Sequence, residues 1–298
     1  MPFNKNKKIE KMHTKVKFTE PGHLEFVEQL NNIDVKIVSA PTIEQFRKTI
    51  SVFMMNTWND KLQYEFDDAA IDKCIQDLFS GKILPTGMET IGITWTVSGI
   101  NMIDTTHLIR HRLFSFSAQT HADRDMRDDL CLVPPGVMAD EQFYDRYRKV
   151  VHDAQELYMD MMDSGAVTCL DARTIMPRCM DHFYIVRCCI KDLIGFCQMR
   201  GDEQIQTQSD NIVAMKLWLE VLKLYPFLKG LVDFRKPDMF YVKQCEEGRT
   251  NIFPPNTKND VMDWRYDQFV HSIPRDEFPG GEVYLKLREE LLAQIDAI

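Results

Sequence analysis

Helical patterning dominates the middle of the 298-residue chain, and it constrains the fold more than any other feature. Apolar side chains recur at helical spacing over residues 141–164, 168–175, 182–199 and 204–224, and Tyr225-Pro226 ends the run. Amphipathic helices bury their apolar faces against another layer. This predicted helical layer therefore needs a sheet or a partner subunit to cover it.

Two earlier segments have the composition of strands. Residues 34–38 alternate in strand fashion up to Pro41, and helical spacing follows over residues 42–55 behind a threonine N-cap. Residues 90–97 are rich in β-branched side chains, and a helix is predicted after them over residues 101–113. The sequence therefore predicts two units of a strand followed by a helix ahead of the helical layer.

Changes in composition divide the chain into three parts. Residues 1–18 carry six lysines and little apolar periodicity, which predicts a solvated basic arm. Residues 19–228 form the predicted main domain, and its polar stretch 116–129 is expected to be a loop. Prolines and a glycine pair interrupt the apolar periodicity over residues 229–298. We interpret them as an extension that wraps on the core and ends in a short helix from residue 282.

Charge and cysteine usage argue against several classes of protein. The formal net charge of −9 argues against nonspecific binding of nucleic acid, which needs an excess of lysine and arginine. Neither a long apolar run nor an apolar signal segment is present, so we expect no membrane span and no export. The eight cysteines lack C-x-x-C and zinc-ligand spacing, which indicates reduced thiols in a cytoplasmic protein without a bound metal.

The densest chemical signal is Arg110-His111-Arg112, at the end of the helix predicted over residues 101–113 and ahead of several hydroxyl side chains. Two guanidiniums, an imidazole and hydroxyls suit an anion and a heterocycle, because arginine binds phosphate through two parallel hydrogen bonds. A solvated helix end explains the same triplet without a ligand, since cations are favourable near the C-terminal end of a helix dipole. The polar residues that follow favour a binding site.

Two further arginines each end an otherwise apolar stretch. Arg173 lies shortly before Pro177, and Arg200 ends the following helical pattern. A guanidinium that is buried without a partner is costly. Either the two arginines form structural ion pairs, with Asp171 and Asp202 as candidates, or both face a nucleotide.

Taken in order, these motifs resemble the flavin-dependent thymidylate synthases. In that family a signature Arg-His-Arg is followed seven or eight residues later by a serine, and this chain has Thr120 after Arg110-His111-Arg112. The family's Ala-Arg-x-x-Leu-Pro motif, and its helix ending near Asn-Phe-Leu-x-Leu-Arg, are similar to residues 172–177 and 193–200. The resemblance covers about residues 85–215, with a looser match back to about residue 33. The order of the motifs is more specific than any one of them.

The resemblance implies which residues bind the flavin. Arg110, His111 and Arg112 match the family's flavin-binding triplet, and Lys191 falls where the family has another flavin-contacting arginine. Glu89 matches a glutamate that precedes a flavin-site histidine of the family, which is replaced here by threonine.

The resemblance also assigns a substrate side. Arg173 and Thr120 match positions that hold the nucleotide phosphate. Arg200 matches the residue that polarises the pyrimidine ring, which makes it both the catalytic and a substrate-binding candidate. His107 falls at a substrate-side glutamine of the family.

The chain departs from the family pattern at several of these positions. Thr120 replaces a serine, Ala118 a glutamate and Gln204 a histidine. Ala122 stands where the family has a phosphate-binding arginine, and Arg124 can take over that contact if the loop follows another path. Otherwise the affinity for the substrate, or its identity, differs.

Fold, chemistry and assembly also follow from the resemblance. It implies an α+β subunit with a central, mostly antiparallel sheet flanked by long helices, assembled as a homotetramer with active sites shared between subunits. The implied reaction is C5 methylation of a pyrimidine deoxynucleotide, of the dUMP-to-dTMP type. Methylenetetrahydrofolate supplies the carbon, reduced FAD the hydride and NADPH the electrons, and no enzyme nucleophile is required.

Four alternatives stay open. Within the family, the chain is a hydroxymethylase or methylase that makes modified bases from dUMP or dCMP, or a catalytically silent nucleotide-binding homologue. Cys179 is similar to the Pro-Cys nucleophile of the unrelated classical thymidylate synthases, but their other motifs are missing, which favours a packing role. His121-x-Asp123, near Asp125 and Asp128, suggests the metal site of a hydrolase, but no second histidine cluster supports it.

Overall fold

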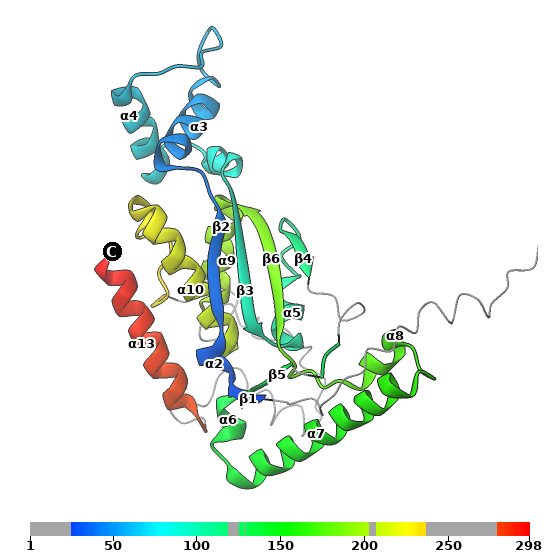
Figure 1. The fold of residues 1–298 in the computed structure, drawn as a ribbon. Coiled ribbons are helices and arrows are strands. Elements are labelled where there is room, and N and C mark those ends of the chain that lie inside the picture. Colours follow the sequence, from blue (N-terminus) through cyan, green and yellow to red (C-terminus); the bar gives the residue numbers. More distant parts are fainter. Residues whose placement is uncertain (1–24, 119–124, 128, 203–206, 237–278) are drawn as a thin grey trace, which may run out of the picture.

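The computed structural model describes residues 25–118, 125–127, 129–202, 207–236 and 279–298, and Figure 1 shows their arrangement. The predicted basic arm lies outside these residues. The first elements are β1 (Glu25–Glu28), α2 (Gln29–Asn32), β2 (Asp34–Ser39), α3 (Ile43–Met55), α4 (Asp68–Phe79), η1 (Pro85–Thr90), β3 (Gly92–Ile100), α5 (Met102–Leu108) and β4 (Ser115–Ala118). The later elements are β5 (Leu130–Val133), α6 (Pro135–Met138), α7 (Glu141–Ser164), α8 (Cys169–Ala172), η2 (Arg173–Ile175), β6 (His182–Cys189), α9 (Ile190–Arg200), α10 (Gln208–Leu224), η3 (Pro226–Leu228) and α13 (Gly281–Ala297).

A four-stranded antiparallel sheet in the order β2-β3-β6-β4 forms the centre of the molecule. Strands β1 and β5 make a separate parallel pair. Helices α9 and α10 cover one face of the sheet, and α13 packs on the outer side of α10 (Figure 1). The predicted fold class, an α+β fold with an antiparallel sheet flanked by long helices, is confirmed.

Strand β3 shows why one face of the sheet is covered. Ile93, Trp95 and Val97 are fully buried, and the threonines that alternate with them are partly exposed. Side chains two residues apart on a strand share a face, so the apolar set points toward the helices. Phe196 of α9 packs on Trp95, with 6.0 Å between the ring centres. Full burial of each such side chain contributes about 2 kcal/mol, and this packing holds α9 against the sheet.

The prediction of one helix over residues 182–199 is wrong in its first half, because His182–Cys189 is strand β6 and helix α9 begins at Ile190. The strand reads His-Phe-Tyr-Ile-Val-Arg-Cys-Cys, and aromatic and β-branched side chains favour a pleated surface. The predicted loop over residues 116–129 is also wrong at its start, since Ser115–Ala118 forms β4 along β6. Pairing with β3 and β4 on its two edges, rather than local spacing, makes β6 a strand.

Other predicted elements are present with shifted ends. Helix α3 begins behind Thr42, whose side chain caps it in a capping box with Gln45. Helix α5 ends at Leu108 rather than at residue 113, and the segment 168–175 divides into α8 and η2. Helix α4 and strands β1 and β5 were not predicted. In the described part of the chain, no helix is both long enough and apolar enough to cross a membrane.

A glycine near the end of β3 turns the chain toward α5. Gly99 has a φ of +71°, and a Cβ there would lie 2.1 Å from the backbone oxygen of Asn32. Glycine adopts this left-handed conformation without strain. The register between β3 and β6 shifts between Val97 and Ile100, at the same place. This irregularity sets the direction of α5 and therefore of its polar side chains.

The described residues pack around two hydrophobic cores. The larger core lies between the sheet and helices α3, α9, α10 and α13. The smaller core includes Cys131 of β5, Val151 and Tyr158 of α7, and Ala172 of α8. Helix α7 runs along the base of the molecule and carries α8 near its far end (Figure 1). Residues on α5 and α9 are therefore positioned by one core, and residues on α8 and η2 by the other.

Candidate functional site

Helix α5 carries the first polar side chains of the candidate site. Asn101 Oδ1 accepts hydrogen bonds from the backbone N–H groups of Ile103 and Asp104 at 2.8 and 3.2 Å. In return, the Asp104 carboxylate accepts from the Asn101 N–H at 3.0 Å. This capping box satisfies N–H groups that the start of a helix leaves unpaired. It also fixes the direction in which His107, about one turn further on, leaves the helix.

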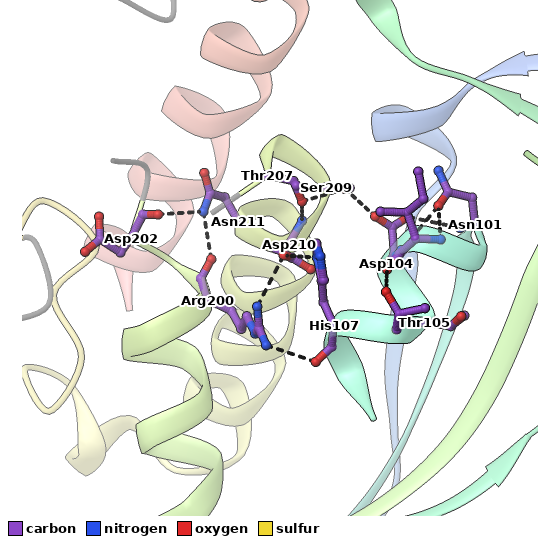
Figure 2. A network of polar contacts seen from close by, with 12 residues as sticks. Asn101, Asp104, Thr105, His107, Arg200, Asp202, Thr207, Ser209, Asp210 and Asn211 are labelled. Carbon is purple, nitrogen blue, oxygen red and sulfur yellow. Dashed lines mark hydrogen bonds and ion pairs between the residues drawn. The ribbon is translucent and has the colours of Figure 1, made fainter. Parts of the chain in front are cut away.

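Arg200, at the end of α9, meets α5 and α10 in a buried polar cluster. Its Nε donates to Nε2 of His111 at 3.0 Å, and Nη2 donates to the backbone oxygen of His107 at 2.9 Å. Its Nη1 lies 3.5 Å from Oδ2 of Asp210, which also accepts from His107 Nδ1 at 2.8 Å. Figure 2 shows Arg200, His107 and Asp210 pointing toward one another. Arg200 and Asp210 are 8% and 6% exposed, so the guanidinium is held in one orientation away from water.

Burial governs the protonation states in this cluster. It lowers the pKa of Arg200, and Asp210 opposes that shift, so the guanidinium stays charged. Burial and the charge of Arg200 together lower the pKa of His111 to about 4. His111 is therefore neutral at neutral pH and accepts the Arg200 hydrogen bond through an unprotonated nitrogen. Its ring centre lies 5.4 Å from that of Phe114 and 4.7 Å from that of Phe196.

A second buried carboxylate, Asp104, lies beside the cluster (Figure 2). It accepts hydrogen bonds from Gln29 Nε2 at 2.7 Å and from Ser209 Oγ at 2.5 Å. Burial raises the pKa of Asp104 to about 6, although the hydrogen bonds from Ser209 and Asn101 oppose the rise. The nearby charge of Asp210 adds to it. The site therefore contains a carboxyl group that changes its charge close to neutral pH.

Asn211 connects the cluster to the C-terminal helix. Its Nδ2 donates to the backbone oxygens of Arg200 and Asp202, at 2.7 and 3.3 Å. Its Oδ1 accepts from the hydroxyl of Tyr284 at 2.8 Å. Tyr284 belongs to α13 and is fully buried. Helix α13 therefore contacts the residue that holds the end of α9 in place.

Three of the predicted site residues, His107, His111 and Arg200, are brought together as direct neighbours. The carboxylate that pairs with Arg200 is Asp210, which was not among the candidates for an ion pair. Two more predicted residues meet elsewhere: Lys191 Nζ lies 2.5 Å from a carboxylate oxygen of Glu89, and this hydrogen bond raises the pKa of Lys191.

Lys191 and Arg200 mark the two ends of α9. Lys191 is its second residue and Arg200 its last. With a rise of 1.5 Å per residue, their backbones are about 14 Å apart along the helix axis. The predicted flavin and substrate residues on this helix therefore lie at separate ends, as expected for two ligands or for one long ligand.

Arg110 and Arg112 lie in the turn after α5 and are exposed to solvent. Within the described ranges of the chain, neither guanidinium pairs with a carboxylate. Their neighbours Ile109 and Leu113 are apolar and are 50% and 74% exposed. The turn thus presents two cations next to apolar surface, with His111 between them facing the buried cluster.

The remaining predicted residues are not joined to this cluster. Arg173 follows α8, is half-buried, and donates from Nε to the backbone oxygen of Leu170 at 3.2 Å. Figure 1 shows α8 near the far end of α7, apart from α9. Thr120 and Arg124 lie outside the described residues, as do His121 and Asp123 of the metal-site alternative.

Sequence reasoning missed Asp104, Ser209, Asp210 and Asn211, although a signal for the two aspartates was present. Asp104 and Asp210 each stand three residues after a helix N-cap, Asn101 and Thr207 respectively. An acidic residue at this position usually indicates the start of a helix. Here both carboxylates are also buried among the site residues, which the capping pattern alone does not reveal.

The fold and the cluster define an α+β protein that gathers arginine, histidine and aspartate side chains from three segments beside an antiparallel sheet. Residues 39–227 match the model of a family described as thymidylate synthase complementing protein. The chain belongs to this family, Thy1, as the resemblance predicted.

Individual relatives are distant in sequence. The flavin-dependent thymidylate synthase of Pyrococcus furiosus is 27% identical over 150 residues, which cover 48% of this chain and 61% of the relative. That of Pyrococcus abyssi is 24% identical over 214 residues, 67% of this chain and 86% of the relative. Among solved structures, the UMP/dUMP methylase PolB from Streptomyces cacaoi bound with 5-Br dUMP has a TM-score of 0.56 and 18% identity. The match covers 68% of this chain and 94% of PolB, and it supports the fold.

Proposed function

We propose that this chain is a flavin-dependent enzyme that methylates C5 of a pyrimidine deoxynucleotide, of the dUMP-to-dTMP type. The proposed carbon donor is methylenetetrahydrofolate, and the proposed reductant is NADPH. The observation that carries the proposal is the position of the exposed Arg110 and Arg112 on either side of His111, which itself contacts Arg200 in the buried cluster. Relatives named flavin-dependent thymidylate synthase, and the methylase PolB, support the same class of reaction.

The groups around the turn after α5 suit FAD. Arg110 and Arg112 are exposed, and among the described residues no carboxylate competes for them, so both can bind phosphate oxygens. The exposed side chains of Ile109 and Leu113 offer apolar surface beside these cations. Lys191, held by Glu89, would add a further cation at the other end of α9. FAD, when bound, supplies the hydride-transfer chemistry that side chains lack.

Arg200 is the residue that we expect to act on the pyrimidine. A fixed positive charge stabilises the negative charge that develops on a ring carbonyl during attack through C5. His111, Asp210 and the backbone oxygen of His107 hold the guanidinium, so it need not reorganise during the reaction. Asp210 also accepts from His107 Nδ1, so Nε2 is the ring nitrogen that can contact the base.

The nucleotide phosphate is assigned to Arg173, with Thr120 and Arg124 as further ligands. Arg173 is positioned by the smaller core, whereas Arg200 is positioned by the larger one. A site that needs both residues is completed most simply if a second subunit supplies Arg173. We therefore propose a homotetramer with shared sites.

The first test is the visible absorption of the purified protein after incubation with FAD. A flavin spectrum is expected for the parent chain, with weaker FAD binding in Arg110→Ala and Arg112→Ala. Arg146→Ala is the matched control, since Arg146 is an exposed arginine on α7. Equal FAD content in all three variants would contradict the proposed flavin site.

The second test identifies the product by mass after incubation with dUMP, dCMP or UMP together with methylenetetrahydrofolate and NADPH. A gain of one methyl group on dUMP is expected. A hydroxymethyl product, or a product from dCMP, would instead identify a modified-base enzyme. Bound flavin and bound nucleotide without any product would identify a catalytically silent homologue.

A further inference from the structure

Two cysteines from distant parts of the sequence meet in the smaller core. Cys131 lies on β5, and Cys179 lies in the segment between η2 and β6. Their Sγ atoms are 3.1 Å apart, and the Cys131 thiol donates to Cys179. Cys131 is fully buried and Cys179 is 9% exposed. Neither thiol contacts the Arg200 cluster, so the proposed reaction does not account for the pair.

The backbone holds the two thiols in place from both sides. The Leu132 N–H donates to the Cys179 oxygen at 2.8 Å, and the Asp181 N–H donates to the Leu130 oxygen at 3.0 Å. Between these bonds, Cys131 pairs with Met180 as an antiparallel bridge. Residues paired in this way have Cα atoms about 5 Å apart. Cys179 directly precedes Met180 in the chain, so its Cα is also close to that of Cys131. A disulfide between the two sulfurs therefore needs little backbone movement.

The surroundings make the two thiols chemically different. Hydrogen bonds from the Cys131 thiol and the Tyr147 hydroxyl lower the pKa of Cys179 to about 7, against the effect of burial. The same contact, together with burial, raises the pKa of Cys131. Tyr147 comes from α7 and completes a cluster of three groups. Cys179 is therefore the nucleophilic thiolate, and Cys131 is placed to resolve its oxidised form.

We propose that Cys131 and Cys179 form a redox-active dithiol that peroxide oxidises to a disulfide. In the first step the Cys179 thiolate attacks one oxygen of hydrogen peroxide, the O–O bond breaks, and the leaving hydroxide takes a proton to form water. Cys179 becomes a sulfenic acid. In the second step the Cys131 sulfur attacks Cys179 Sγ, and the sulfenic hydroxyl leaves with the Cys131 proton as a second water. Two thiols and one peroxide thus give one disulfide and two waters.

The other described cysteines for which a shift is resolved provide a contrast within the same chain. Burial raises the pKa of Cys74, Cys188, Cys189 and Cys197, so these thiols stay protonated at neutral pH and react slowly. The disulfide would fix the segment between Arg173 and β6 onto β5.

The chain is convenient for a direct test by mass spectrometry. Reduced full-length protein is treated with one equivalent of hydrogen peroxide, alkylated and digested with trypsin. Cleavage after arginine places Cys131 in the peptide 128–146 and Cys179 in the peptide 179–187, each with a single cysteine. The expected product is these two peptides linked by a disulfide, and reduction should release them.

Three variants separate the steps of the reaction. Cys131→Ser should stop at the sulfenic acid of Cys179, which dimedone traps. Tyr147→Phe removes one hydrogen-bond donor, so the pKa of Cys179 should rise and its alkylation at pH 7 should slow, by about fivefold for a rise of about one pH unit. Cys74→Ser, the matched control, should form the disulfide as the parent does. Far-UV circular dichroism establishes that each variant is folded before oxidation.

Two results would overturn the proposal. One is the absence of the linked peptides at a peroxide dose that oxidises other cysteines of the folded chain. The other is a rate of alkylation of Cys179 no higher than that of Cys74 in the same sample. Neither measurement depends on flavin or nucleotide, so the dithiol and the proposed enzymatic function can fail independently.

Discussion

Replacing Asp210 with asparagine tests how the Arg200 cluster is held together. The substitution keeps the size of the side chain but removes the charge that lies 3.5 Å from Arg200 Nη1 and accepts from His107 at 2.8 Å. The side chains of Arg200 and Asp210 are 10% and 7% exposed, so water screens the pair weakly. Breaking a buried ion pair costs about 3–5 kcal/mol, and asparagine retains one acceptor oxygen. We therefore expect Asp210→Asn to lower the free energy of unfolding by about 3 kcal/mol.

Urea denaturation at neutral pH, followed by far-UV circular dichroism, measures this loss if parent and variant share one m-value. Asp153→Asn is the matched control, because Asp153 pairs with Lys149 at 2.6 Å on the exposed side of α7. Such surface pairs contribute less than about 1 kcal/mol. If Asp210→Asn costs no more than Asp153→Asn, the charge of Asp210 does not stabilise the buried guanidinium, and the reasoning about the cluster is refuted.

Two further predictions concern Asp104 and Tyr284, which lie beside the Arg200 cluster. The pKa of Asp104 rises on folding from 3.8 to about 6, so the folded state binds the proton more tightly than the unfolded state. Protonation of Asp104 therefore stabilises the folded state. This contribution is complete below about pH 4 and is lost as the pH rises through about 6. Between about pH 4 and about pH 6 the parent should lose about 2 kcal/mol more stability than Asp104→Asn in a series of urea denaturations, and parallel pH profiles would contradict the shift. Tyr284→Phe leaves the buried Oδ1 of Asn211 without its donor and should cost about 2 kcal/mol, whereas Tyr64→Phe at an exposed site should cost almost nothing. Equal thermal midpoints for these two variants would show that the C-terminal helix does not support the cluster.

Local patterns in the sequence were sufficient for several helices. Helix α3 follows from a threonine cap and apolar residues at helical spacing, and α7 and α10 follow from long stretches of the same spacing. Such features depend on neighbours within one or two turns, so they can be read along the chain. Strand β6 could not be read in this way, because its pairing partners β3 and β4 lie about 65 to 95 residues earlier.

The residues of the candidate site were likewise only partly predictable from the sequence. The order of the arginine motifs identified the family and three residues of the cluster, because motif spacing is a property of the chain itself. Asp210 follows Arg200 by ten residues and His107 by 103, and its contacts with both exist because α10 packs against α9 and α5. Cys131 and Cys179, 48 residues apart, meet for a similar reason.

The sequence by itself therefore determined the family, most helices and the cationic residues of the site. Tertiary structure decided which carboxylates face those cations, which histidine is neutral, and which thiols can react with each other. Burial is the physical reason, since the pKa of His111 and of Asp104 moves only when packing removes the group from water and places a particular neighbour beside it.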